Sequence, residues 1–371
     1  MRIRLADPDF GADEIAAVEA VLRSGWLVQG TQVADFERAV AAAVGVTEAV
    51  AVNSCTTALM LALQALGIGR GDEVITAALS YPATANVIEM VGARPVFVDV
   101  GIDDGNLDPH QLDAAVTSKT RAIVPVHLFG AMADMDAVLA TAARCGAAVI
   151  EDAACALGAE RWIDGQFRRA GAVGALGCFS FHPRKNITTG EGGMLTTNKP
   201  DLAEKLRRLR NHGATVRNGV YEFPVVGGNY RLTEMQAALG VVQMRKLEAI
   251  TARRRALAHL YDAALAGVDA VYLPRLPEGS RSVFQSYVVL LDPTIDRAKV
   301  IAGLRKREIE STLPTYALPL IAYYRNKYGY TPREFPVAER VSTQGLALPL
   351  HPRMRDEDVD TVVDALREVA A

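Results

Sequence analysis

The sequence has few cysteines, few histidines and no metal-binding pattern. Its 371 residues include four cysteines (Cys55, Cys145, Cys155 and Cys178), which lie far apart and form no Cys-x-x-Cys pair. This spacing argues against a disulfide scaffold or a zinc knuckle and is typical of a reducing compartment. The six histidines show no metal-ligand spacing either, so we expect no metal site.

A strong charge imbalance and a membrane-length segment are also missing. The net charge is −3, and the N-terminal segment MRIRLADPDFGADE has no apolar stretch of signal-peptide length. No later segment approaches the roughly 20 apolar residues of a membrane span. We therefore expect a cytoplasmic protein that binds neither nucleic acid nor a membrane.

The chain does contain a regular alternation of helix-like and strand-like segments. Apolar residues at helical spacing predict two helices, over 15–22 and 33–44, each followed by a glycine. Short β-branched runs then alternate with helix-length segments, and this alternation predicts a mostly parallel sheet covered by helices on both faces. The predicted strands are 49–52, 73–76, 95–100, 122–126, 147–150, 177–181 and 193–197, and the predicted helices between them include 57–66, 84–91 and 134–144.

The character of the sequence changes near residue 245. The segment 245–265 is typical of one long helix, and we interpret its three arginines at 253–255 as a solvated helix face. A strand-like segment at 287–291 and a closing helix over 356–369 follow. Because domains usually have roughly 100–200 residues, the chain length favours two of them. We predict a large α/β domain over 1–246 and a smaller α+β domain over 247–371, with the long helix as hinge or brace.

Polar residues directly follow two of the predicted strands, where ligands bind in open parallel sheets. The segment NSCTT (53–57) opens a helix whose free backbone N–H groups suit a phosphate, although Ser54 or Thr56 could equally be a plain helix cap. Glu151 and Asp152 end another strand. A carboxylate at this position could cap a helix, form a structural ion pair or hold a ligand.

Lys185 is the strongest single candidate for chemistry. It lies in FSFHPRKNITTGEGG, between two predicted strands, among aromatic residues and glycines that let the backbone approach a ligand closely. A lysine in an apolar or cation-flanked pocket can have its pKa lowered, which makes its amine a nucleophile that forms Schiff bases. Most loop lysines are merely exposed charges, but this neighbourhood is unusual for an exposed loop.

Seven motifs that include these sites resemble, in order, those of the DegT/DnrJ/StrS family of sugar aminotransferases, along nearly the whole chain. They are NSCTTAL (53–59), LSYPATAN (79–86), VPVHLFGAMADM (124–135), EDAACALGA (151–159), CFSFHPRKNITTGEGGM (178–194), GGNYRLTEMQAALGVVQ (227–243) and LALPLHP (346–352). The resemblance implies the fold-type-I architecture, with a large α/β/α domain and a smaller α+β domain. It also implies pyridoxal 5′-phosphate (PLP) as cofactor and a homodimer with its active sites at the interface.

The resemblance also implies roles for individual residues. Lys185 would form the Schiff base and move the proton, while Asp152 would keep the pyridine nitrogen protonated so that the ring accepts electrons. The other implied cofactor-binding residues are Thr56, the backbone at Cys55, Ser180, Tyr81 stacked on the ring (or instead a core aromatic), and Asn229 from the neighbouring subunit. Arg231 and His182 are candidates for substrate binding.

Two residues depart from the family pattern. Cys155 stands where the family most often has Gln or His, near the 3′-oxygen of the cofactor, and Cys55 stands where Gly is usual. Because a thiol is a weaker hydrogen-bond partner, Cys155 either contacts the cofactor or simply packs. Neither change removes a group that transamination requires.

The implied reaction is a ping-pong transfer of an amino group from L-glutamate to a keto-sugar, with a nucleotide-linked keto-deoxysugar as the expected acceptor. A keto-cyclitol acceptor, a PLP-dependent sugar dehydratase of the same family and a non-catalytic PLP-binding regulator are the alternatives. A nucleotide-dependent oxidoreductase is disfavoured because no Gly-x-Gly-x-x-Gly follows the first strand. The tyrosine-rich segment 316–330 could line a sugar or nucleotide pocket or be a structural cover.

Overall fold

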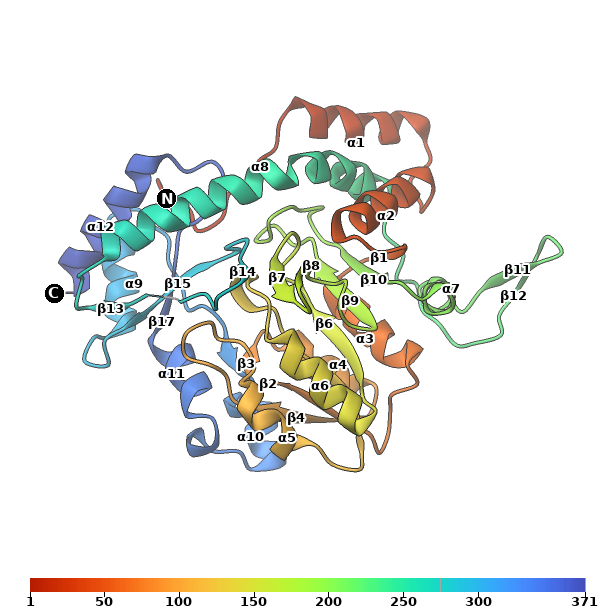
Figure 1. Cartoon of the computed structure of the whole chain (residues 1–371). Coiled ribbons are helices and arrows are strands. Elements are labelled where there is room, and N and C mark those ends of the chain that lie inside the picture. Colours follow the sequence, from red (N-terminus) through yellow and green to blue (C-terminus); the bar gives the residue numbers. More distant parts are fainter. Residues whose placement is uncertain (274, 371) are drawn as a thin grey trace.

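A seven-stranded sheet forms the centre of the computed structural model, which describes residues 1–273 and 275–370 (Figure 1). Its strand order is β1 (Glu48–Val52), β10 (Gly193–Thr197), β9 (Leu176–Ser180), β6 (Ala148–Asp152), β5 (Thr120–Val124), β2 (Glu73–Ala77) and β4 (Arg94–Val98). Only β10 is reversed, since it pairs antiparallel with both neighbours. The other six strands therefore run in the same direction and end at the same edge, which confirms the predicted, mostly parallel sheet.

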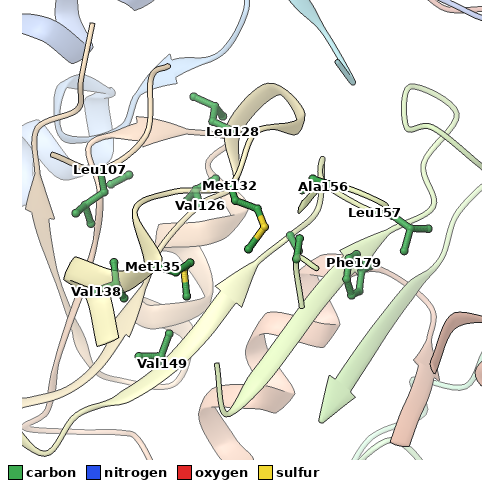
Figure 2. Close-up of a cluster of buried hydrophobic side chains, with 14 of the residues drawn as sticks. Leu107, Val126, Leu128, Met132, Met135, Val138, Val149, Ala156, Leu157 and Phe179 are labelled. Atoms are coloured by element: carbon green, nitrogen blue, oxygen red, sulfur yellow. The ribbon is translucent and has the colours of Figure 1, made fainter. Parts of the chain in front are cut away.

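Helices cover both faces of this sheet, as predicted. One face packs against α2 (Thr31–Val44) and α6 (Met135–Cys145), and the other against α3 (Cys55–Ala65), α4 (Ala83–Met90) and α7 (Pro200–Leu209). Figure 2 shows part of the first core, with Met135 and Val138 of α6 beside Val149 of β6. No helix in the two described ranges combines the length and apolar character that crossing a bilayer requires.

A smaller antiparallel sheet lies in the C-terminal part of the chain. It consists of β13 (Val271–Tyr272), β15 (Tyr287–Leu291) and β17 (Gly345–Leu348). Together with α9 (Arg297–Lys306), α12 (Asp356–Ala370) and the end of α8 (Glu234–Leu265), it encloses a separate core. Because α8 runs through both parts (Figure 1), the division at 246/247 remains a prediction.

The remaining elements lie outside these two sheets. They are α1 (Ala12–Ser24), α5 (Leu112–Ala115), α10 (Ala322–Tyr328), α11 (Pro336–Gln344), β3 (Leu79–Ser80), β7 (Glu160–Ile163), β8 (Gln166–Arg169), β11 (Thr215–Arg217), β12 (Val220–Glu222), β14 (Ser280–Arg281) and β16 (Tyr316–Ala317). The β11–β12 hairpin projects away from the body of the molecule (Figure 1).

The long helix α8 begins eleven residues before the predicted start at 245. Thr233 caps it, because the Thr233 side chain accepts a hydrogen bond from the backbone N–H of Gln236. Gly240, an unfavourable residue inside a helix, lets α8 lie close to α2, since a Cβ at this position would come within 2.7 Å of the Phe36 ring. Packing of α8 against α2 thus outweighs the low helix propensity of Gly240, which lies before the predicted start of the helix.

The interpretation of residues 253–255 as a solvated face is wrong. Arg254 is 2% exposed, and its guanidinium donates to the backbone carbonyls of Phe284, Gln285 and Leu350. Arg255 likewise donates to the carbonyl of Ser282. These two guanidinium groups bind backbone carbonyls of distant loops, so α8 acts as a brace. Helical periodicity in the sequence does not indicate such partners.

Most of the tyrosine-rich segment 316–330 is a structural cover. Tyr324 is fully buried and donates its hydroxyl to Asn86 of α4, and Tyr328 donates to Glu89 of the same helix. Tyr316 differs, because it is 41% exposed and lies edge-on to Tyr81 with ring centroids 6.4 Å apart. Tyr316 also pairs with Ser80 of β3, so it lies beside the start of the segment that carries Tyr81.

Candidate active site

Lys185 lies in the loop between β9 and β10, at the edge where the parallel strands end. The loop is held by backbone hydrogen bonds from Phe181 to Gly192 and from Thr189 to Phe181. The side chain of Lys185 is half-buried, and its Nζ donates a hydrogen bond to Sγ of Cys155 at 3.1 Å. Cys155 belongs to the turn that follows β6, so two neighbouring strands bring the amine and the thiol together.

The pKa of the Lys185 amine is raised, and the prediction that it would be lowered is wrong. Burial does lower this pKa, but the acidic neighbours Cys155, Cys55 and Asp152 outweigh burial. The prediction assumed an apolar or cation-flanked pocket. In the fold, the groups that lie closest to the amine are acidic and stabilise the ammonium form.

Asp152 ends β6 and is 3% exposed. Its Oδ2 accepts a hydrogen bond from Oγ1 of Thr84 at 2.7 Å, and its Oδ1 accepts one from the backbone N–H of Ala154 at 3.2 Å. Burial raises the pKa of this carboxyl group against the effect of these hydrogen bonds and of Lys185. A carboxylate offers about four lone-pair sites, so Asp152 can still accept a hydrogen bond from a cationic N–H.

Glu151 is the structural member of the Glu151–Asp152 pair. Its carboxylate and the His127 ring are both completely buried, with Nε2 and Oε2 2.9 Å apart. Nδ1 of His127 accepts the backbone N–H of Ala133, so the ring proton lies on Nε2 and is donated to Glu151. Three backbone N–H groups also donate to Glu151, those of Gly171, Val173 and Gly174. Glu151 therefore anchors two loops behind the strand.

The N-terminus of α3 lies at the same edge of the sheet. Ser54 is its plain cap, because its side chain accepts the N–H of Thr57, whereas Thr56 is exposed. A Cβ at Gly193 would lie 2.4 Å from the Ser54 carbonyl, so the start of β10 packs directly on this turn. Ser180 ends β9 and is half-buried. A helix N-terminus beside hydroxyl groups suits an anion such as a phosphate.

Tyr81 is 68% exposed and follows β3 at this edge. The alternative that Tyr81 is a core aromatic is therefore wrong. Its ring is available to a flat ligand, whereas its stacking on a cofactor stays a prediction.

The remaining predicted residues lie around this group. The Asn229 side chain is exposed, although the adjacent Tyr230 carbonyl accepts the N–H of Asn53 next to α3. Arg231 donates to Oδ1 of Asn211 at 2.5 Å. His182 is half-buried, and burial lowers its pKa. The structure thus brings Lys185, Asp152, Cys155, Cys55 and Ser180 to one edge of the sheet, with the other predicted residues nearby.

Sequence reasoning missed Thr84 and Ser80, which support Asp152. The hydroxyls of Ser80 and Thr84 lie 2.9 Å apart, and Thr84 donates onward to Asp152. Ser80 ends β3 and Thr84 lies in the first turn of α4, so their contact crosses a strand–helix boundary and no helical period in LSYPATAN indicates it. His127 likewise carried no local signal, since its partner is 24 residues away in sequence.

The C-terminal part of the chain closes over the Lys185 loop. The Gln285 side chain donates to the carbonyl of Arg184 at 2.8 Å. A small pocket beside this contact is lined by Leu5, Ala6, Arg184, Gln285, Ser286, Leu348 and Leu350. Residues from both ends of the chain therefore border the candidate site.

This donor set fits PLP. PLP presents an aldehyde, a pyridine nitrogen and a phosphate, and the edge of the sheet offers an amine, a buried carboxylate with spare acceptor capacity, and a helix N-terminus. Lys185 would hold the aldehyde carbon, Asp152 the pyridine nitrogen, and the first turn of α3 with Ser180 the phosphate.

Comparisons with known proteins identify the family of the chain. The model of the DegT/DnrJ/EryC1/StrS aminotransferase family matches residues 8–367. The chain is 40% identical to the spore coat polysaccharide biosynthesis protein SpsC of Bacillus subtilis (strain 168), over 98% of this chain and 95% of SpsC. It is also 40% identical to a GDP-perosamine synthase of Caulobacter vibrioides, over 99% of this chain and 98% of that protein.

A solved structure of a similar protein agrees with this family assignment. DesV of S. venezuelae, crystallised in complex with a ketimine intermediate, superimposes with a TM-score of 0.90 at 37% identity. The match covers 97% of this chain and 94% of DesV. The agreement in fold and sequence therefore extends through both parts of the chain.

Proposed function

The chain belongs to the DegT/DnrJ/EryC1/StrS aminotransferase family and is a PLP-dependent sugar aminotransferase, and from this premise we propose that it transfers the amino group of L-glutamate to a nucleotide-linked keto-deoxysugar. The observation that carries the proposal is that the Lys185 amine and the buried Asp152 carboxylate lie near each other at one edge of the sheet. The same site would take the two substrates in turn, as in a ping-pong reaction.

Lys185 is the proposed attachment point of the cofactor and the group that carries a proton to and from the substrate carbon. When bound, PLP supplies the electron sink that accepts the electron pair left behind by that proton. Asp152 would hold a proton at the pyridine nitrogen, supported from behind by Thr84. The first turn of α3, with Thr56 and the backbone at Cys55, would orient the phosphate together with Ser180.

A sugar acceptor is supported by the relatives and by the open side of the site. Relatives at 40% identity include a GDP-perosamine synthase, whose name denotes an amino-sugar product on a nucleotide carrier. Tyr81 and Tyr316 expose their rings side by side at this edge, and exposed aromatic rings suit sugar or base faces. Arg231 and His182 are the proposed polar contacts to the substrate.

We further propose a homodimer in which Asn229 reaches the phosphate of the neighbouring subunit. Asn229 is exposed, and nearby Phe223 and Val226 are 64% and 94% exposed at the base of the projecting hairpin. The predicted apolar stripe of α1 also faces outward, with Ile15 and Leu22 at 69% and 54% exposure. Exposed apolar side chains in such number are typical of a surface that a second copy covers.

An absorption experiment tests the donor half of the reaction. Lysine-bound PLP absorbs at roughly 410–430 nm, so wild type should show this band and Lys185→Ala should not. L-Glutamate should bleach the band in wild type, after which keto-sugars can be screened as acceptors. A band that glutamate leaves unchanged would exclude glutamate as donor and favour the dehydratase or the non-catalytic regulator.

A subunit-mixing experiment tests the shared site. Lys185→Ala and Asn229→Ala subunits should each be weakly active alone, because each lacks one part of every site. After the two proteins are mixed and allowed to exchange subunits, half of the dimers are mixed and carry one intact site, so activity should recover to about one quarter of wild type. No recovery despite exchange would show that Asn229 does not act across the interface.

A further inference from the structure

Cys155 makes a contact that the family resemblance does not explain. It lies in the turn after β6, three residues beyond Asp152, and its Sγ accepts the hydrogen bond of Lys185 Nζ at 3.1 Å. Both side chains are half-buried. Because Nζ is the reacting atom of the proposed function, a group bonded to Nζ affects the chemistry directly.

Four titratable groups surround the Lys185 amine, each from a different segment. Cys155 lies on the turn after β6, Asp152 at the end of β6, Cys55 in the first turn of α3, and His182 on the lysine's own loop. Burial raises the pKa of Cys55 well above its usual range and lowers that of His182, so burial favours the uncharged form of each. Asp152 accepts a hydrogen bond from Thr84. Of these four groups, Cys155 is the one that forms a hydrogen bond with Nζ.

We propose that Cys155 is a positioning residue for Lys185, which holds the amine as an ammonium ion at the end of β6 and thereby sets the pH at which PLP attaches. The proposal rests on the proposed role of Lys185. Attachment joins Nζ to the aldehyde carbon of PLP, and the aldehyde oxygen leaves as water with the two protons of the neutral amine. The ammonium ion must therefore release one proton to solvent first, and any group that stabilises the ion delays attachment.

The size of the effect follows from the hydrogen bond. A bond to a charged donor that is lost without replacement shifts the protonation equilibrium by about one pH unit. Cys155→Ala should therefore lower the pH midpoint of PLP attachment by about one unit. At a fixed pH below the midpoint, attachment should become about tenfold faster. Cys155→Ser keeps an acceptor at the same place and should stay within a few tenths of a unit of wild type.

The test follows PLP attachment to the PLP-free full-length protein between about pH 8 and pH 12, a range that brackets the ordinary pKa of lysine, by the visible absorption of lysine-bound PLP. Borohydride reduction and peptide mass spectrometry then identify the lysine that carries the cofactor. Cys145→Ala is the matched control, since Cys145 is half-buried at the end of α6, and its midpoint should equal that of wild type. Cys155→Val removes the acceptor at similar volume and replaces Cys155→Ala if the alanine variant does not fold.

The outcomes separate this inference from the function it rests on. A midpoint lowered by Ala or Val but restored by Ser supports Cys155 as the positioning group. An unchanged midpoint in the Ala or Val variant, or an equal shift in the Ser variant, overturns the inference while leaving Lys185 as the attachment point. PLP found on another lysine would instead overturn the proposed role of Lys185.

Discussion

Replacement of Glu151 by glutamine tests the buried anchor behind the active-site edge. The carboxylate accepts four hydrogen bonds, from His127 and from three backbone N–H groups. Glutamine is almost the same size, but its amide offers one acceptor oxygen and one donor group. Whichever way the amide is oriented, two of the four donors face an N–H group in place of an oxygen.

The expected cost follows from these two donors. A buried donor left without an acceptor costs about 1–3 kcal/mol, so two of them cost about 2–6 kcal/mol. A neutral amide is easier to bury than a carboxylate, which offsets part of this cost. His127 cannot relieve the conflict by moving its proton to Nδ1, because Nδ1 already accepts the N–H of Ala133. We therefore expect a net destabilisation of about 3 kcal/mol.

Thermal unfolding of the PLP-free protein measures this cost, and a loss of about 3 kcal/mol should lower Tm by about 4 °C in a chain of this length. Glu160→Gln is the matched control, since Glu160 forms ion pairs with Arg169 and Arg281 near the surface. Ion pairs of this kind contribute about 0–1 kcal/mol, so the Tm of the Glu160→Gln control should stay close to that of wild type. Equal Tm values for Glu151→Gln and Glu160→Gln would refute the assignment of Glu151 as an anchor.

Three further predictions concern other parts of the molecule. Burial lowers the pKa of His351 to about 4 from 6.5. The unfolded chain therefore binds the proton first, and this group removes about 3 kcal/mol of stability as the pH falls from 6.5 to 4. In urea unfolding, His351→Asn should therefore reduce the dependence of the free energy of unfolding on pH over that range. Gly193→Ala should weaken PLP binding at least about tenfold, because the added Cβ displaces the first turn of α3. Gly69→Ala is the control: its Cβ would meet only a carbonyl at 3.4 Å, so the PLP affinity measured by titration should stay unchanged. Arg254→Met should cost about 3 kcal/mol in urea unfolding because three buried carbonyls lose their donor, and a loss under about 1 kcal/mol would contradict the role of α8 as a brace.

The sequence was sufficient for the order of the elements and for the edge at which the site lies. Strand and helix periods are local properties, so short β-branched runs predicted the strands of the parallel sheet to within a few residues. Because ligands bind where parallel strands end, the position of Asp152 at the end of a predicted strand already indicated the edge at which the site lies. The resemblance of the motifs to those of the family then indicated PLP as the cofactor.

Contacts between distant segments depended on the tertiary structure. The Cys155–Lys185 hydrogen bond joins residues 30 apart and the Thr84–Asp152 hydrogen bond residues 68 apart, so no local pattern indicates either. For the same reason, Arg254 looked like a solvated charge until its carbonyl partners were known, and Lys185 looked like a candidate for a lowered pKa until its acidic neighbours were known.

The physical reason for this division is the range of each interaction. Hydrophobic period, helix capping and turn preference act over a few residues and can be read from the chain itself. The pKa of a lysine or the satisfaction of a buried guanidinium depends on which groups the register of the strands places within a few ångströms. The sequence thus determined the framework and the reacting residues, and only the folded arrangement determined what surrounds and supports them.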